Sequence, residues 1–244
     1  MLLHAFPLDG RMWAPQVEAL GATYDVVVPD LRGFGTAGGE AVEVADMDML
    51  ADDVARLLDA RGLDRVVLGG LSMGGYVAFA FARRHAARLG GLVLADTKAG
   101  ADSEEAARAR LQMADRVLAE GMGFVPEVML PRLLGPTSRE RHPELVEQVV
   151  KLIGQQDPRG VAGAQRGMAR RPDSTATLSQ VTVPTLVLAG SEDELTGPEE
   201  GRALAAAIPD ARFVQIGGAG HLSNLEQPEQ VSEALLDFLA PLWI

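Results

Sequence analysis

The sequence contains no cysteine and only four histidines among its 244 residues. The lack of cysteine excludes disulfides, thiolate nucleophiles and cysteine-bound metal sites. The histidines are dispersed and no His-Glu-x-x-His sequence occurs, so the clustered ligands of a zinc hydrolase are missing. We therefore expect neither a metal ion nor an organic cofactor.

Long apolar runs and an excess of positive charge are missing too. No stretch approaches the roughly 20 apolar residues needed to span a bilayer. Residues 1–10 lack the basic region and the long apolar core of a secretory signal. The formal net charge of −12 disfavours nucleic acid and anionic membranes as partners. We expect a cytoplasmic protein that acts on a small molecule, and a homodimer is left open.

Short runs rich in valine and leucine alternate with helical patterns along most of the chain. The runs predict strands, and the apolar periodicity between them predicts helices. Strands without polar alternation, separated by helices, indicate a mostly parallel sheet covered on both faces. The predicted strands are residues 26–29, 66–68, 92–95, 185–189 and 212–216, and the predicted helices are residues 46–61, 76–85, 198–207 and 229–239.

The interval 97–177 breaks this alternation because it contains no convincing strand. Its patterns predict helices over residues 104–120, 143–153 and 161–170. We interpret it as an all-helical cap inserted into an α/β core formed by residues 1–96 and 178–244. The alternative is a separate helical domain unrelated to any site.

The start of the chain reads as the end of a strand with almost nothing before it. Residues 1–4 are Met-Leu-Leu-His, and a buried strand that opens at residue 1 or 2 is unusual. We therefore expect that the N-terminal strands of the sheet are missing from this sequence.

A serine lies between a predicted strand and a predicted helix, in the pattern Gly70-x-Ser72-x-Gly74. A sharp strand-to-helix turn requires residues without side-chain bulk beside the serine, and it exposes the serine hydroxyl. The first N–H groups of the following helix then point toward whatever lies in front of that hydroxyl. The pattern predicts a nucleophile, and the alternative is an ordinary glycine-rich loop.

A serine hydroxyl requires a histidine base, and the base requires an orienting carboxylate. His85 ends a helix beside two arginines and is expected to cap it or face solvent, and His142 precedes a proline in a polar stretch. His221 follows a predicted strand in a glycine-rich loop, which can reach across a cleft. We predict His221 as the base, the alternative being a loop histidine without a partner.

Two aspartates follow predicted strands, at the sheet edge where ligands bind in α/β proteins. Asp193 comes after the helical interval and 28 positions before His221, which leaves room for one helix and one strand. We favour Asp193 as the orienting acid and interpret Asp96 as a structural neighbour. The chain order is then serine, aspartate, histidine, as expected of a strand–serine–helix turn.

The oxyanion formed when the serine attacks a carbonyl requires preorganised hydrogen-bond donors. We predict the N–H of Met73, directly after the serine, as one donor. The second is the N–H of Phe6, because Pro7 has no N–H to offer. The alternative for residues 4–10 is a plain strand-to-helix turn packed by an aromatic ring.

Together these motifs resemble the α/β-hydrolase superfamily, and within it small bacterial serine esterases and 3-oxoadipate enol-lactonase-like hydrolases. The resemblance rests on residues 4–13 (HAFPLDGRMW), 30–35 (DLRGFG) and 70–75 (GLSMGG), and on Asp193 and His221. It implies an α/β-hydrolase fold, Ser72 as nucleophile, Asp193 as acid, His221 as base and the Phe6 and Met73 amides as oxyanion hole. Ala5 departs from the family's usual glycine, and the first strands of the family sheet are absent.

We predict a serine hydrolase that cleaves a small carboxylic ester or lactone through an acyl-enzyme. The alternatives are a cofactor-free perhydrolase or haloperoxidase with the same triad, and a non-catalytic ligand-binding homologue. Residues 33–38 fit the dinucleotide pattern G-x-G-x-x-G, but neither a directly preceding strand nor a well-formed helix flanks them, so we do not predict a nucleotide site.

Side chains of the helical interval offer two predictions about the substrate. Seven of its apolar residues would floor an acyl pocket, and the alternative is plain helix core: Leu111, Met113, Val117, Met122, Phe124, Met129 and Met168. An arginine in the pocket would favour a substrate with a free carboxylate, and the alternative is a solvated helix face. The candidate arginines are Arg166, Arg170 and Arg171.

Overall fold

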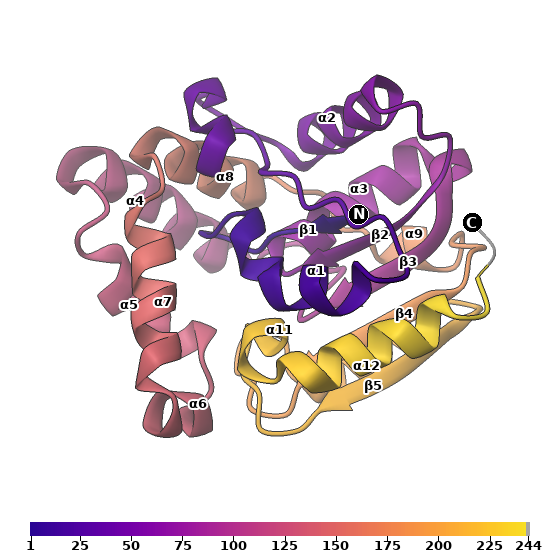
Figure 1. The fold of residues 1–244 in the computed structure, drawn as a ribbon. Helices are drawn as coiled ribbons and strands as arrows, with labels where there is room; N and C mark the ends of the chain where they lie inside the picture. The colour runs from indigo at the N-terminus through magenta and orange to yellow at the C-terminus, as the bar shows by residue number, and fades with distance from the viewer. Residues whose placement is uncertain (243–244) are drawn as a thin grey trace.

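The computed structural model describes residues 1–242 and is built around one five-stranded sheet (Figure 1). Neighbouring strands all run parallel, in the order β1-β2-β3-β4-β5. The predicted parallel sheet is therefore confirmed. The strands are β1 (Leu2–Leu3), β2 (Val66–Leu71), β3 (Leu89–Ala95), β4 (Thr185–Gly190) and β5 (Ala211–Ile216).

Helices cover both faces of this sheet, and the apolar side chains of strands and helices form the core. α1 packs against α12 over one face, and α2 packs against α3 over the other (Figure 1). No helix within residues 1–242 has the length and apolar character to cross a membrane. The helices around the sheet are α1 (Ala14–Leu20), α2 (Met47–Ala60), α3 (Met73–Arg84), α10 (Pro198–Ala206) and α12 (Pro228–Leu239), with the short α9 (Thr175–Leu178) and α11 (Ser223–Glu226).

One predicted strand is absent from the sheet. Residues 26–29 lie beside β1, where the N–H of Leu2 donates to the carbonyl of Val27 at 2.9 Å, but they form no strand. Among the described residues that bond is the one backbone hydrogen bond between residues 26–29 and β1, whereas a parallel ladder requires a regular series of them. The prediction of a strand at 26–29 was wrong, whereas missing N-terminal strands stay a prediction.

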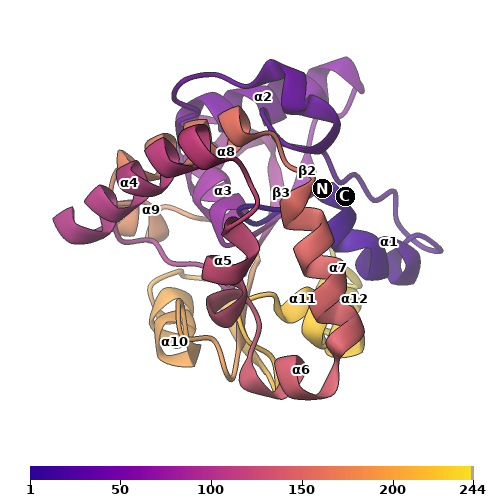
Figure 2. The ribbon, with the colours of Figure 1, turned by 90° about the vertical axis from the view of Figure 1, so that its left-hand side faces the viewer.

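Between β3 and β4 the chain forms five helices ahead of the short α9: α4 (Glu104–Glu120), α5 (Val125–Leu133), α6 (Pro136–Arg141), α7 (Pro143–Gly154) and α8 (Pro158–Ala169). Side-chain hydrogen bonds cap the starts of two of them, α4 and α8. The Ser103 side chain accepts from the N–H of Ala106 at 3.2 Å, and the Asp157 carboxylate accepts from the N–H of Arg159 at 2.8 Å. The helices gather at one side of the sheet (Figure 2), with α4 packed along α8. The division into core and cap stays a prediction.

Glycines let α8 approach the core backbone very closely. A Cβ on Gly160 would lie 1.7 Å from the carbonyl oxygen of Gly33, and one on Gly167 would lie 1.8 Å from that of Ala45. Gly33 itself has φ +88°, a conformation that side chains disfavour. The glycines at 33–38 that mimic a dinucleotide pattern thus belong to a loop that contacts α8.

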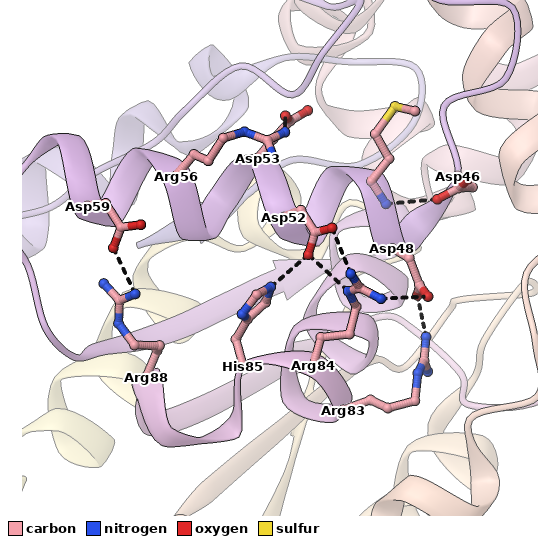
Figure 3. A network of polar contacts seen from close by, with 11 residues as sticks. Asp46, Asp48, Asp52, Asp53, Arg56, Asp59, Arg83, Arg84, His85 and Arg88 are labelled. Atoms are coloured by element: carbon pink, nitrogen blue, oxygen red, sulfur yellow. Dashed lines mark hydrogen bonds and ion pairs between the residues drawn. The ribbon is translucent and has the colours of Figure 1, made fainter.

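Ion pairs join α2 to α3 and to the turn after it (Figure 3). The Asp52 carboxylate accepts from Arg84 at 2.7 Å and contacts His85 Nε2 at 2.8 Å, and Arg88 reaches Asp59 at 2.9 Å. Because solvent screens exposed pairs of this kind, they contribute little to the stability of the fold. His85 therefore has a partner on α2, where solvent or a helix cap was expected.

Candidate active site

Ser72 lies on a sharp turn between β2 and α3, with φ 55° and ψ −111°. Its N–H donates to the carbonyl of Ala95 at 2.9 Å, and the hydroxyl of Thr97 donates to the Ser72 carbonyl at 2.9 Å. A Cβ on Gly70 would lie 2.2 Å from the Gly74 backbone, and one on Gly74 would lie 2.4 Å from the carbonyl oxygen of Leu3. Only glycine fits at these positions, because the turn brings backbone against backbone.

The turn brings the Ser72 hydroxyl to His221, although the two residues are 149 positions apart in the chain. The Ser72 Oγ lies 2.7 Å from His221 Nε2, and His221 Nδ1 lies 2.8 Å from Asp193 Oδ2. The His221 side chain is 3% exposed and that of Asp193 is fully buried. The three residues predicted as nucleophile, base and acid thus form one continuous chain of hydrogen bonds.

The Asp193 carboxylate has several donors besides His221. Its Oδ1 accepts from the N–H groups of Leu195 at 2.8 Å and Thr196 at 3.1 Å, and its Oδ2 accepts from the Thr196 hydroxyl at 2.8 Å. Burial acts to raise the pKa of Asp193, but His221 and these hydrogen bonds outweigh burial and bring it below its usual value. The carboxylate is therefore ionised near neutral pH and can orient the imidazole.

The two residues predicted to supply the oxyanion donors are Met73, which follows Ser72, and Phe6. Met73 is the first residue of α3, and N–H groups in the first turn of a helix have no acceptor within it. Phe6 lines the same cavity as Ser72 and His221. The loop that carries Phe6 is shaped by bonds around Ala5, whose N–H donates to the Met12 sulfur at 3.1 Å and whose carbonyl accepts from Leu8 at 2.9 Å.

A cavity of about 580 Å³ opens in front of Ser72 and His221. Helices α4, α5 and α8 supply much of its wall, and three of the seven predicted apolar residues line it: Met113, Met129 and Met168. The other four do not, because Leu111 is 40% exposed, Val117 and Met122 are buried in the core, and Phe124 packs against the core. The lining contains both apolar and charged side chains, so the cavity can accept an organic substrate with a polar end.

The arginines predicted to face the pocket lie elsewhere. Arg166 pairs with Asp115 at 3.0 Å, Arg170 is exposed, and Arg171 is buried against Asp102 at 2.7 Å. None of the three lines the cavity, so the hypothesis that one of them faces the pocket was wrong and the alternative, that they lie away from it, holds. The reason is that the arginine-bearing face of α8 packs along α4 and the Asp102 loop.

Other cations, which the sequence reading missed, line the cavity: Lys98, Arg110 and Arg132. Arg110 pairs with Asp102. Within residues 1–242, neither Lys98 nor Arg132 takes part in an ion pair. A usable signal existed for Lys98, because it follows a strand at the edge of the sheet where ligands bind.

Two further histidines, His4 and His142, contact groups outside the hydrogen-bond chain. His4 is fully buried, and its Nε2 accepts from the N–H of Leu31 at 3.0 Å. Burial lowers the pKa of His4, which keeps the ring neutral in this role. His142 is exposed beside Glu144. Among the described residues no group of three or more histidine, aspartate and glutamate side chains could hold a metal ion.

A serine, a histidine and an aspartate in contact at the carboxyl edge of a parallel sheet define the hydrolase class of α/β protein. The model of the α/β hydrolase fold family matches residues 1–228. The chain therefore belongs to the α/β-hydrolase family, and both the fold prediction and the family resemblance are confirmed.

Proteins similar to this chain include esterases and enol-lactonases. A thermophilic esterase from Thermogutta terrifontis, solved with malate bound, is 49% identical with a TM-score of 0.96, covering 99% of this chain and 89% of that one. The enol-lactonase from Burkholderia xenovorans LB400 is 33% identical with a TM-score of 0.90, over 98% and 90%. The 3-oxoadipate enol-lactonase 1 of Acinetobacter baylyi is 30% identical, over 95% of this chain and 84% of its own.

Proposed function

We propose that the protein is a serine hydrolase that cleaves a small carboxylic ester or lactone, with Ser72 as the nucleophile. The observation that carries the proposal is the hydrogen-bond chain from Ser72 through His221 to the ionised Asp193. Its esterase and enol-lactonase relatives support the same reaction class.

In this mechanism His221 Nε2 takes the Ser72 proton while Oγ attacks the substrate carbonyl carbon. The N–H groups of Met73 and Phe6 donate to the oxyanion of the tetrahedral intermediate. The His221 imidazolium then protonates the leaving alkoxide, and the C–O bond breaks to leave Ser72 acylated. A water molecule deprotonated by His221 attacks the acyl-enzyme and releases the acid. With a lactone, the alcohol and the acid leave as one hydroxy acid.

A fluorophosphonate probe tests the nucleophile directly. We expect one probe per chain, attached to Ser72 and located by peptide mass spectrometry, and no labelling of the Ser72→Ala variant. Reaction at another residue, or none, would contradict the proposal and favour a non-catalytic binding protein. Turnover of acetate, peroxide and bromide without ester hydrolysis would favour the perhydrolase alternative.

The charges of the cavity support a substrate that carries a carboxylate. Asp102 is neutralised by Arg110 and Arg171, which leaves Lys98 and Arg132 against the exposed Glu105 on the cavity wall. The protein as a whole has a net charge of −12, so this local excess of positive charge is not an average property of its surface. We propose that Lys98 and Arg132 bind an anionic group remote from the scissile bond.

Substitution of both cations by methionine should change substrate preference. For monoethyl glutarate, whose free carboxylate would reach them, we expect kcat/KM to fall about 10- to 30-fold in the Lys98→Met, Arg132→Met variant, because charge-assisted hydrogen bonds are lost. For the neutral ethyl valerate we expect a change below about threefold. Arg139→Met, on the exposed side of α6, serves as the control. Equal losses for both esters would contradict an anion subsite.

A further inference from the structure

Asp96, directly after β3, is a buried carboxyl group that the proposed mechanism does not use. It is fully buried and has φ 45°, a left-handed conformation that is uncommon for residues with a side chain. It does not line the cavity, and His221 contacts Asp193 instead. Asp96 is therefore not the orienting acid, and its burial and backbone strain need another explanation.

The side chain of Asp96 joins the two loops that carry Asp193 and His221. Its Oδ1 accepts from the N–H of Gly190 at 2.8 Å, at the end of β4 and three residues before Asp193. Its Oδ2 accepts from the hydroxyl of Ser223, two residues after His221 and 127 positions along the chain from Asp96. One carboxylate thus contacts both loops at once.

The backbone on either side of Asp96 contacts the third loop. The Ala95 carbonyl accepts from the N–H of Ser72, and the Thr97 hydroxyl donates to the Ser72 carbonyl, each at 2.9 Å. The N–H of Asp96 itself donates to the Leu188 carbonyl at 2.9 Å, which ties the segment to β4. Residues 95–97 therefore contact the loops of all three residues of the hydrogen-bond chain.

We propose that Asp96 is a positioning residue that holds the His221 and Asp193 loops at the distance from Ser72 that proton transfer requires. The inference rests on the proposed function, and Asp96 acts only through Gly190 and Ser223. Misplacement of a reacting group by about 1 Å costs on the order of 100-fold in rate, so a small loop movement is enough to impair catalysis.

The charge surroundings of Asp96 agree with such a role. Burial, and after it the negative charge of Asp193, raise the pKa of Asp96 well above its usual value, despite the hydrogen bonds from Ser223 and Gly190. A carboxyl group in this place costs stability, and stability lost for a preorganised site is typical of functional residues. The proposed role requires that the side chain of residue 96 makes both hydrogen bonds, to Gly190 and to Ser223, and so fixes the distance between the two loops.

Three variants separate hydrogen bonding from charge. In Asp96→Asn the amide oxygen can accept from Gly190 and the amide nitrogen can donate to Ser223, so we expect kcat for p-nitrophenyl acetate within about threefold of the wild type. Asp96→Ala loses both contacts, and we expect kcat to fall about 100-fold with KM changed less than about threefold. Ser223→Ala loses one contact and should cost about tenfold in kcat. Adding it to Asp96→Ala should cost nothing more, because the two residues share one interaction.

A spectroscopic readout distinguishes positioning from a merely structural role. The proton shared by His221 Nδ1 and Asp193 should give a downfield ¹H NMR signal that persists in Asp96→Asn and shifts or disappears in Asp96→Ala. Leu58→Ala, in the core of α2, is the matched control for destabilisation and should keep both kcat and the signal. If Asp96→Ala does not fold, Ser223→Ala carries the test because it leaves β3 unchanged.

Several outcomes would overturn the inference. Unchanged kcat and an unchanged signal in folded Asp96→Ala, or in Ser223→Ala, would leave Asp96 only structural. An Asp96→Asn variant as inactive as Asp96→Ala would assign the role to charge instead of hydrogen bonding. If the proposed function itself is wrong, Ser72→Ala keeps its activity. That result is distinct from every outcome that concerns Asp96 alone.

Discussion

Ser72→Ala is expected to lower kcat/KM for p-nitrophenyl acetate by about 10⁴- to 10⁶-fold, as expected when the nucleophile of a triad is removed. The change deletes only the Oγ that lies 2.7 Å from His221 Nε2. The N–H of residue 72 still donates to Ala95, and its carbonyl still accepts from Thr97, so the turn keeps its hydrogen bonds. The variant should therefore fold with a Tm within a few degrees of the wild type and bind substrate without acylation.

The control for this experiment is Ser179→Ala, an exposed serine after α9, which should keep full activity. Purified enzyme should be assayed by stopped-flow for a burst of p-nitrophenol, which reports acylation. The wild type should show a burst wherever deacylation is slower than acylation, and Ser72→Ala should show none. Retention of more than a tenth of wild-type kcat/KM by Ser72→Ala would rule out Ser72 as the nucleophile.

Asp193→Asn is expected to lower kcat by about 10⁴-fold with little change in KM, because it stabilises the wrong tautomer of His221. Oδ1 of Asp193 accepts from the N–H groups of Leu195 and Thr196, so the amide oxygen of asparagine must take that place. The amide nitrogen then faces His221 Nδ1 and donates to it. The imidazole must carry its proton on Nε2, where it cannot accept the proton of Ser72.

The matched control for Asp193→Asn is Glu194→Gln, the exposed neighbour, whose kcat should stay within about twofold. Steady-state kinetics of both variants, with Asp96→Asn alongside, compare the two strand-end aspartates directly. A loss for Asp96→Asn larger than that for Asp193→Asn would transfer the role of orienting acid to β3. Near wild-type kcat in Asp193→Asn would contradict a triad.

Much of the fold was predictable because its signals are local. The helix at 104–120 matches α4 residue for residue, and β4 and β5 differ from their predicted spans by one residue at one end. The strand predicted at 26–29 failed because strand formation depends on a partner, and the segment has one backbone hydrogen bond to β1. Pattern alone does not reveal how a segment pairs with its neighbour.

The candidate active site also combines features that the sequence determines with features that it does not. The sequence alone determined the sharp turn at Ser72, since the glycines at 70 and 74 and the flanking strand and helix are all local features. It also determined that carboxylates and a histidine follow strands, and therefore that they lie at one edge of a parallel sheet.

Only the tertiary structure decided which of these side chains meet. Asp193 contacts His221, whereas Asp96 contacts Gly190 and Ser223, although both aspartates end neighbouring strands. The cations of the cavity are Lys98 and Arg132, not the arginines of α8 and the loop after it. The physical reason is that contacts between loops that lie 28 to 127 positions apart in the chain depend on strand order and on helix packing, which no local pattern encodes.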